Sequence, residues 1–328
     1  MRKLLSIVLV LILALGLMTG CGAAPKEAAA AGQKLQVVTT IFPIYDWTLN
    51  VVGDRGDKVE VTMLVDNGVD LHSYQPSAED IVRISSCDLL IYVGGESDKW
   101  VTDILQETSN KSMRVVSLLD VLGDAVKEEE IVEGMEQDQD DEDGHDHESP
   151  ELDEHVWLSL KNAAVLVGAI ADALGQLDGE NASLYASNAD AYTDRLNALD
   201  GRYREVVDGA THHTLLFGDR FPFRYLVDDY GLDYYAAFAG CSAETEASFE
   251  TVVFLAGKLD ELGLPAVLQI ESANSSIART VVENSKSGDR QILTLDSMQS
   301  VTAKDIAAGA SYLSTMEKNL DVLKAALG

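Results

Sequence analysis

The side chains best suited to bind a metal ion gather in one short acidic stretch of the sequence. "DEDGHDHESPELDEHVW", residues 141–157, holds three of the chain's six histidines, His145, His147 and His155. Imidazole and carboxylate groups are the usual protein ligands of zinc and of neighbouring metals. Three interpretations are open: the three histidines form one metal site, they serve different functions, or the stretch is only a solvated charged loop.

Four more candidate ligands each lie at the end of a predicted strand or shortly after it. They are His72, Asp219, Glu271 and Asp296. In open α/β sheets, ligands bind outside the carboxyl ends of the strands. A single loop histidine is usually a surface residue, and a carboxylate at a strand end is often a helix cap. Only the common location of these residues favours a binding site.

The elements that must position these residues alternate between strands and helices. The first half has predicted strands at 35–40, 59–65, 88–94 and 113–118, with helices at 43–53, 77–85, 98–108 and 160–174. The second half repeats the rhythm with strands at 213–217, 234–239, 265–271 and 290–296. Alternation of this kind predicts parallel sheets with helical crossovers.

A long helical stretch separates the two halves. Residues 179–207 contain no proline and carry a mixed polar face, which is typical of a rigid connector. The expected fold class is therefore α/β with two lobes, each a parallel sheet flanked by helices, bridged by one long helix. The expected lobes are residues 34–178 and 209–328, with the connector at 179–208.

The first 33 residues indicate targeting and tethering. "MRK" precedes an apolar run of about fifteen residues, which is too short for a comfortable membrane span. Small residues then precede Cys21, as in the bacterial lipoprotein signal. The pattern predicts a signal peptide at 1–20, lipid on Cys21, a tether at 21–33 and an extracytoplasmic location on the cell membrane. An ordinary secretory signal is the alternative.

The charge of the chain excludes some partners and marks one segment. A net charge of −31 argues against binding to nucleic acid or to an anionic lipid surface. Residues 128–154 hold fifteen Asp or Glu and no Lys or Arg. A segment so acidic and so poor in apolar residues is expected to be a mobile loop.

The remaining cysteines and the missing motifs narrow the chemistry further. Cys87 and Cys241 lie far apart in the predicted lobes, so we expect free buried thiols without a disulfide. The count also excludes a four-cysteine metal site. The sequence has no Walker A loop, no GxGxxG opening a helix and no GxSxG elbow, which removes the commonest enzyme classes for this architecture.

Two short motifs resemble those of a known family. Residues 70–80, "DLHSYQPSAED", resemble the pattern D-P-H-x-Y-x-P-x-x-x-D, and residues 153–162, "DEHVWLSLKN", resemble D-P-H-x-W-x-D-P-x-N. These patterns belong to the ZnuA-like substrate-binding lipoproteins of zinc and manganese ABC importers, and the resemblance extends over nearly all of residues 34–328. It implies a metal held in the cleft between two lobes, an ABC permease with its ATPase subunit as partners, and no enzymatic activity.

The resemblance assigns metal-ligand roles to His72 and His155 in the first lobe and to Asp296 in the second. The chain departs from the family at the third ligand, where the family has His or Glu. An ungapped match puts Arg220 there, and a guanidinium has no lone pair to give to a cation. Either the adjacent Asp219 takes the ligand role, with Arg220 supporting a ligand, or water replaces the missing protein group.

The family often carries an insertion rich in histidine and acid just before its second motif, thought to gather or sense zinc. Residues 128–154 stand at that place, with His145 and His147 as the candidate collecting pair. A purely solvating acidic spacer is the alternative. Zinc is the expected ion, because two imidazoles suit it, and manganese or iron is the alternative, because an oxygen-rich remainder suits harder ions.

The leading hypothesis is a monomeric, non-catalytic metal carrier, and two other classes stay open. A metal-dependent hydrolase would use the same His and Asp residues with an open coordination position. Glu271 would be its base, whereas in the carrier Glu271 supports a ligand. A surface adhesin would depend on exposed residues that the sequence does not reveal.

Overall fold

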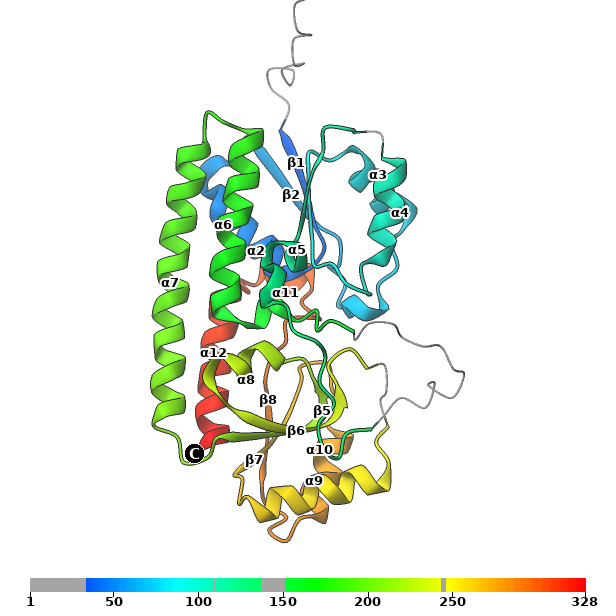
Figure 1. Ribbon diagram of the computed structural model, residues 1–328, viewed down its shortest axis with the longest axis vertical. Helices are drawn as coiled ribbons and strands as arrows, with labels where there is room; N and C mark the ends of the chain where they lie inside the picture. Colours follow the sequence, from blue (N-terminus) through cyan, green and yellow to red (C-terminus); the bar gives the residue numbers. More distant parts are fainter. Residues whose placement is uncertain (1–33, 109, 137–150, 243–245) are drawn as a thin grey trace, which may run out of the picture. The chain divides into compact units, whose positions relative to one another are not determined.

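Two parallel sheets of four strands each organise the chain (Figure 1). The computed structural model describes residues 34–108, 110–136, 151–242 and 246–328. Leu35–Gly328 forms one unit, separate from Met1–Lys34, and the fold is that of the larger unit. The long helix α7, Ala182–Asp208, runs alongside both sheets. The prediction of two α/β lobes joined by one long helix is confirmed.

The first sheet has the strand order β2-β1-β3-β4. Its strands are β1 (Leu35–Thr39), β2 (Val59–Met63), β3 (Leu89–Tyr92) and β4 (Arg114–Ser117). Helices α2 (Phe42–Val52), α5 (Leu118–Leu122) and α6 (Leu160–Leu177) pack on one face, and α3 (Ala78–Ser86) and α4 (Lys99–Glu107) on the other. Leu89 and Ile91 join the first core and Leu90 the second, as the two-residue period of a strand requires. A capping box formed by Ser77 and Asp80 begins α3.

The second sheet has the order β6-β5-β7-β8. Its strands are β5 (Thr214–Phe221), β6 (Asp233–Ala239), β7 (Ala266–Gln269) and β8 (Gln291–Thr294). Its helices are α8 (Arg224–Tyr230), α9 (Phe249–Glu261), α10 (Ser276–Asn284), α11 (Ala303–Ala307) and α12 (Tyr312–Leu327). Because β5 is longer than predicted, Asp219 and Arg220 lie within the strand and not after it. Gly218 lets α10 approach the strand closely, since a Cβ there would lie 2.5 Å from the Cα of Ala278.

Helix α7 is fastened to both lobes. It has 27 residues, a length of about 40 Å, and it contacts α2 and α6 in the first lobe and α8 and α12 in the second. The Tyr192 hydroxyl donates to Asp46 of α2 at 3.2 Å, and the Tyr203 hydroxyl donates to the Met316 carbonyl of α12 at 2.7 Å. These two buried hydrogen bonds fix the position of the connector relative to each lobe.

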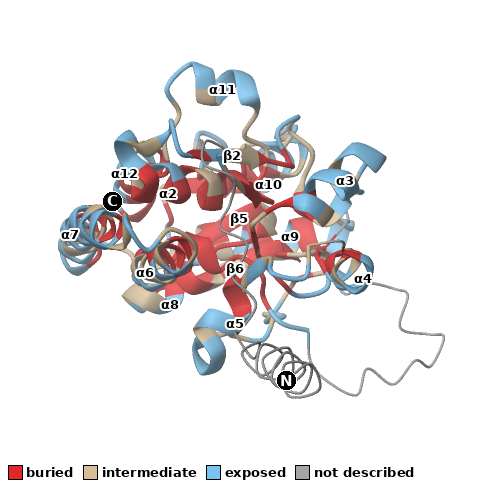
Figure 2. Cartoon of the chain, turned by 90° about the horizontal axis from the view of Figure 1, so that it is seen from above, coloured by how far each residue is buried: buried red, intermediate tan, exposed pale blue. Residues whose placement is uncertain are grey.

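The junction between the lobes is built around Trp157, which is fully buried. Its ring N–H donates to the Ser297 carbonyl at 2.9 Å, and its own carbonyl accepts from the Tyr312 hydroxyl at 2.7 Å. One apolar core continues through both lobes at this level, and Figure 2 shows the buried residues gathered in the middle of the molecule, with α11 exposed at the rim. The lobes are therefore joined by packing as well as by the connector.

The expectation of a mobile loop over residues 128–154 is wrong for its two flanks. The Glu129 N–H donates to the Glu151 carbonyl at 2.9 Å, and the Glu136 N–H donates to the Ala237 carbonyl of β6 at 2.9 Å. The first flank thus crosses from the first lobe to the edge of the second sheet. Acidic composition does not prevent this order, because the backbone groups of the flanks find partners.

Several predictions concern residues outside the described part of the chain. They are the signal peptide at 1–20, the tether at 21–33, the lipid on Cys21, and the metal-collecting role of His145 and His147. These stay predictions.

The junction yields a stability prediction. Tyr312→Phe removes the hydroxyl that satisfies the buried Trp157 carbonyl, so we expect the free energy of unfolding of the metal-free protein to fall by about 1–3 kcal/mol. Chemical denaturation measures this change. Tyr45→Phe is the matched control, because the Tyr45 hydroxyl has no hydrogen bond among the described residues. Equal stability of the two variants would contradict the role of the Tyr312 bond.

Candidate functional site

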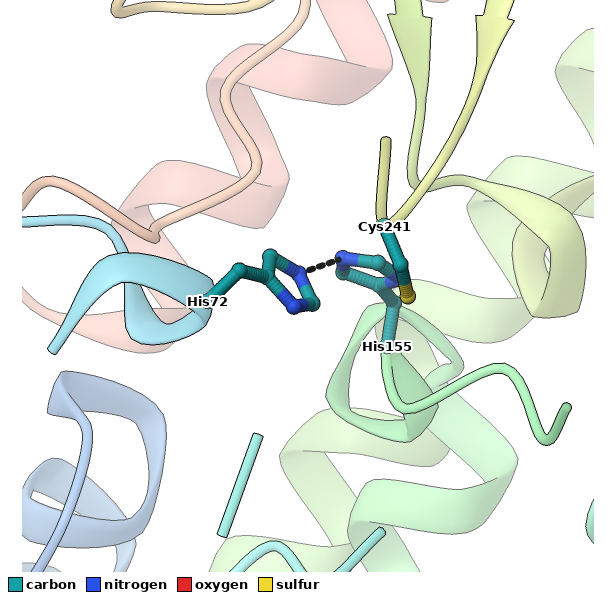
Figure 3. Close-up of side chains that lie close together, drawn as sticks. All are labelled: His72, His155 and Cys241. Atoms are coloured by element: carbon teal, nitrogen blue, oxygen red, sulfur yellow. Dashed lines mark hydrogen bonds between the residues drawn. The ribbon is translucent and has the colours of Figure 1, made fainter. Parts of the chain in front are cut away.

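His72, His155 and Cys241 bring three candidate metal-ligand atoms together (Figure 3). His72 lies in a 3-10 turn, Leu71–Ser73, His155 directly precedes a second 3-10 turn, and Cys241 follows β6. One ligand atom from each residue lies within 4.8 Å of the other two. Among the described residues, no other group of three or more His, Cys, Asp or Glu side chains has its ligand atoms this close together.

Both histidines turn the same ring nitrogen toward this point. The Nε2 atoms of His72 and His155 are 3.1 Å apart. Nδ1 of His155 lies 3.0 Å from Asp153 Oδ1, and Nδ1 of His72 lies 2.7 Å from Ser97 Oγ and 3.6 Å from Glu154 Oε2. A carboxylate beside each Nδ1 favours a proton there and directs each Nε2 toward the other ring. A bound cation would stabilise that arrangement.

Burial and charge set the protonation of the pair. Burial, followed by the neighbouring His155, lowers the pKa of His72 to about 4. Burial also opposes protonation of His155, but the carboxylates of Asp153, Glu154 and Asp70 together outweigh it and raise the pKa of His155. His72 is therefore neutral near pH 7, which is the form that binds metals.

The turn that carries His72 is held from the second lobe. Asp70 accepts the His72 backbone N–H at 3.0 Å with one oxygen and the Arg220 guanidinium at 2.7 Å with the other. Burial opposes ionisation of Asp70, but Arg220 and His72 together outweigh it and lower the pKa of this carboxyl. Arg220 also donates to the Ser242 carbonyl at 3.4 Å, so it links the His72 turn to the loop that contains Cys241.

Glu154 lies behind His72, in space that is open because the residue opposite it, Gly95, has no side chain. The carboxylate is 1% exposed and accepts the Ser97 N–H at 2.9 Å. Gly95, at a φ of +84°, faces Glu154, and a Cβ there would lie 2.8 Å from the carboxyl carbon. Only glycine provides both this backbone conformation and the space that Glu154 fills.

A cavity of about 390 Å³ leads to the group from the surface. His72, Cys241 and Glu154 line it, together with the exposed residues Glu96 and Glu151. Lys99 also lines the cavity and pairs with Glu96, so Glu151 and Glu154 supply its net negative charge beside His72.

Asp219 is not brought into the group of ligand atoms. Its Oδ1 accepts the Arg220 N–H at 2.8 Å, and its Oδ2 accepts the Ile270 N–H at 2.9 Å. The carboxylate therefore joins β5 to the end of β7. Burial raises the pKa of Asp219, and both backbone bonds counteract it.

Asp296 and Glu271 also lie outside the group. Asp296 Oδ1 accepts the Met298 N–H at 2.8 Å, and Glu271 accepts the backbone N–H groups of Ser297 at 2.7 Å and Gln299 at 3.0 Å. Burial, and then the charge of Glu271, raise the pKa of Asp296 to about 6. In this arrangement both carboxylates shape the loop after β8.

Cys241 is the group member that the sequence interpretation missed as a ligand. Its thiol is free, as expected, but it is half-buried and lies beside both histidines. The available signal was its position, since Cys241 follows a predicted strand by two residues at the same sheet edge as the other candidates.

Comparison with known proteins identifies related sequences. Residues 37–326 match the family described as "Zinc-uptake complex component A periplasmic". The zinc-binding lipoprotein AdcA of Streptococcus pneumoniae serotype 4 is 32% identical over 298 residues, which cover 90% of this chain and 56% of that protein. The high-affinity zinc uptake system protein ZnuA of Bacillus subtilis is 30% identical over 320 residues, which cover 95% of this chain and 94% of that protein.

A solved structure agrees with the sequence matches. The crystal structure of the Zn(II)-bound ZnuA-like domain of Streptococcus pneumoniae AdcA has a TM-score of 0.69 and 29% identity, covering 90% of this chain and 99% of that one. The chain spans 57% of the length of the Streptococcus pyogenes AdcA proteins that it matches. The similarity therefore concerns the ZnuA-like part of those longer proteins.

The lowered pKa of His72 predicts a pH dependence of stability. Since folding disfavours the protonated ring, the contribution of His72 is fully present above pH 6.5 and is lost as the pH falls toward 4. Between pH 7 and pH 4, the metal-free wild type should lose on the order of 3 kcal/mol more unfolding free energy than His72→Gln. Denaturant titrations at both pH values measure this, and identical losses in the two proteins would contradict it.

Proposed function

Because the chain belongs to the family of zinc-uptake complex component A, we propose that it captures zinc outside the cytoplasm and delivers it to an ABC importer. His72 and His155 are the metal ligands in this proposal. The observation that carries it is the pair of Nε2 atoms 3.1 Å apart, each in a ring that an oxygen holds at Nδ1. Zinc is the cargo of the protein and not a catalytic cofactor.

The geometry of the pair suits zinc. Two imidazole nitrogens on a tetrahedral zinc, each about 2.0–2.1 Å from the ion, are about 3.3 Å apart. The observed separation of 3.1 Å needs little adjustment. The zinc names of the Streptococcus pneumoniae and Bacillus subtilis relatives support zinc over manganese.

The acidic cavity supports capture from solution. Glu151 is exposed in its lining, and its charge attracts a divalent cation toward His72, whereas the charge of Glu96 is balanced by Lys99. His145 and His147 complete the proposal as weak collectors, since their segment joins the chain just before Glu151. Deleting residues 137–150 should remove their weak binding and leave the tight site.

Delivery requires partners that the proposal names by role. An ABC permease receives the metal, and an ATPase subunit supplies the energy. Lipid on Cys21 holds the monomeric protein at the membrane near that permease. The resemblance to lipoproteins of this family supports each of these points.

The arrangement of Glu271 favours a carrier over a hydrolase. A hydrolase needs a general base beside the metal and within reach of a bound water. Both Glu271 oxygens instead accept hydrogen bonds from Ser297, and Gln299 and Ser300 add two more. A carboxylate so occupied anchors a loop and is a poor base.

Removing either histidine tests the site. We expect His72→Ala and His155→Ala to lower zinc affinity by more than about 100-fold, because each deletes one ligand of the ion. Isothermal titration calorimetry and metal analysis of the purified protein measure this. His213→Ala is the control, because His213 is exposed and lies outside the ligand group. Tight binding in both site variants would refute the proposal.

Gly240 provides a test that leaves every ligand in place. An added Cβ would lie 3.1 Å from Cε1 of His155 and 2.9 Å from the Phe221 carbonyl oxygen, so Gly240→Ala should shift the imidazole. We expect zinc affinity to fall about 10-fold or more, as when a group that orients a ligand is lost. Gly257→Ala, whose Cβ meets nothing within 4 Å, should bind like the wild type. Equal affinity of both variants would show that His155 does not depend on this packing.

A further inference from the structure

We infer that Cys241 is the third protein ligand, so that two imidazoles and one thiolate hold the ion. This inference rests on the proposed function and concerns the same site. The chain needs such a donor, because Arg220 has no lone pair to give and is paired with Asp70. Asp219 does not supply it either, since each of its oxygens accepts a backbone N–H group.

The positions of the three donors fit one ion. On a tetrahedral zinc, a thiolate sulfur lies about 2.3 Å from the metal and therefore about 3.6 Å from each imidazole nitrogen. The Cys241 sulfur is already within 4.8 Å of a ring nitrogen of His72 and of His155. A tetrahedral zinc needs a sulfur–nitrogen separation about 1 Å shorter than this limit, and Cys241 lines the cavity together with His72.

The loop that carries Cys241 is held from three directions. Its backbone N–H donates to Glu129 Oε1 at 2.9 Å, from the flank that crosses between the lobes. The carbonyl of Ser242 accepts from Arg220, which also holds Asp70 of the His72 turn. The Ser242 N–H donates to the Ala239 carbonyl at the end of β6 at 3.4 Å. Arg220, which stands where the family has its third ligand, thus helps to position Cys241, which takes over the ligand role.

Cys87 shows what a cysteine without such a role looks like in this chain. It is 1% exposed in the core between α3, α4 and the first sheet, and its thiol donates to the Ile84 carbonyl at 3.2 Å. Among the described residues, Cys87 belongs to no group of three or more candidate ligand side chains with metal-site spacing. Cys241, by contrast, lines a cavity and lies within 4.8 Å of a ring nitrogen of each of the two histidines.

A thiolate changes which ions the site prefers. Soft sulfur donors favour zinc and copper(I), whereas manganese prefers oxygen ligands. The thiol proton leaves to solvent as the metal–sulfur bond forms, so the site gains a negative charge only when the ion is present. The departure from the family pattern therefore sharpens the preference for zinc over manganese.

Cobalt(II) titration tests the inference in the chain carrying Cys21→Ser, which removes the thiol outside the site. We expect a sulfur-to-cobalt charge-transfer band in the near ultraviolet, together with the visible bands of a tetrahedral ion. The ultraviolet band should persist in Cys87→Ala and vanish in Cys241→Ser and Cys241→Ala. Zinc affinity should fall at least about 10-fold in both Cys241 variants, with a smaller loss for manganese.

The outcomes separate this inference from the proposed function. Tight zinc binding without a sulfur band in the parent protein overturns the role of Cys241 and leaves the carrier in place. Absence of zinc binding in the parent refutes both. Circular dichroism and thermal melting of the metal-free Cys241 variants establish that they fold, and loss of the band in Cys87→Ala alone would place the sulfur ligand elsewhere.

Discussion

The hydrogen bonds of Trp157 at the junction of the lobes are the constraint on which the site depends. Trp157 donates to the second lobe at Ser297 and accepts from Tyr312, while His155 lies two residues before it. Because these bonds are buried, they fix the segment that carries His155 relative to both lobes. The continuous apolar core and the connector α7 oppose a large opening between the lobes. Release of an ion would then depend on local movement near the site.

The acidic residues around the site divide between two tasks. Asp153 and Glu154 lie behind the imidazoles and fix which nitrogen each ring presents. Asp70, Asp219 and Glu271 hold backbone or guanidinium groups and set the shape of the loops. A carboxylate with its oxygens occupied in this way is a weak competitor for an ion. The chemistry of the site therefore depends more on its nitrogen and sulfur donors than on its many acids.

Much of the fold followed from local patterns, because strand and helix periodicity, the Ser77 cap and proline-free connector are properties of neighbouring residues. Only part of the site could be predicted from the sequence. His72 and His155 stand in motifs with fixed spacing, whereas the roles of the carboxylates depend on which backbone N–H group each one meets. Those partners come from distant segments, as Ile270 does for Asp219. Charge alone gave the wrong prediction for the acidic flanks, since their backbone groups bond to each other and, at Glu136, to β6.

The sequence by itself determined the two α/β lobes, the long connector, the family and the two histidine motifs. Only the tertiary structure decided that Cys241 lies beside those histidines and that Arg220 pairs with Asp70 across the lobes. The physical reason is range: periodicity and motif spacing act over a few residues, but Cys241 and His72 are far apart in the chain. Their proximity arises only when two separate sheets pack against one buried tryptophan.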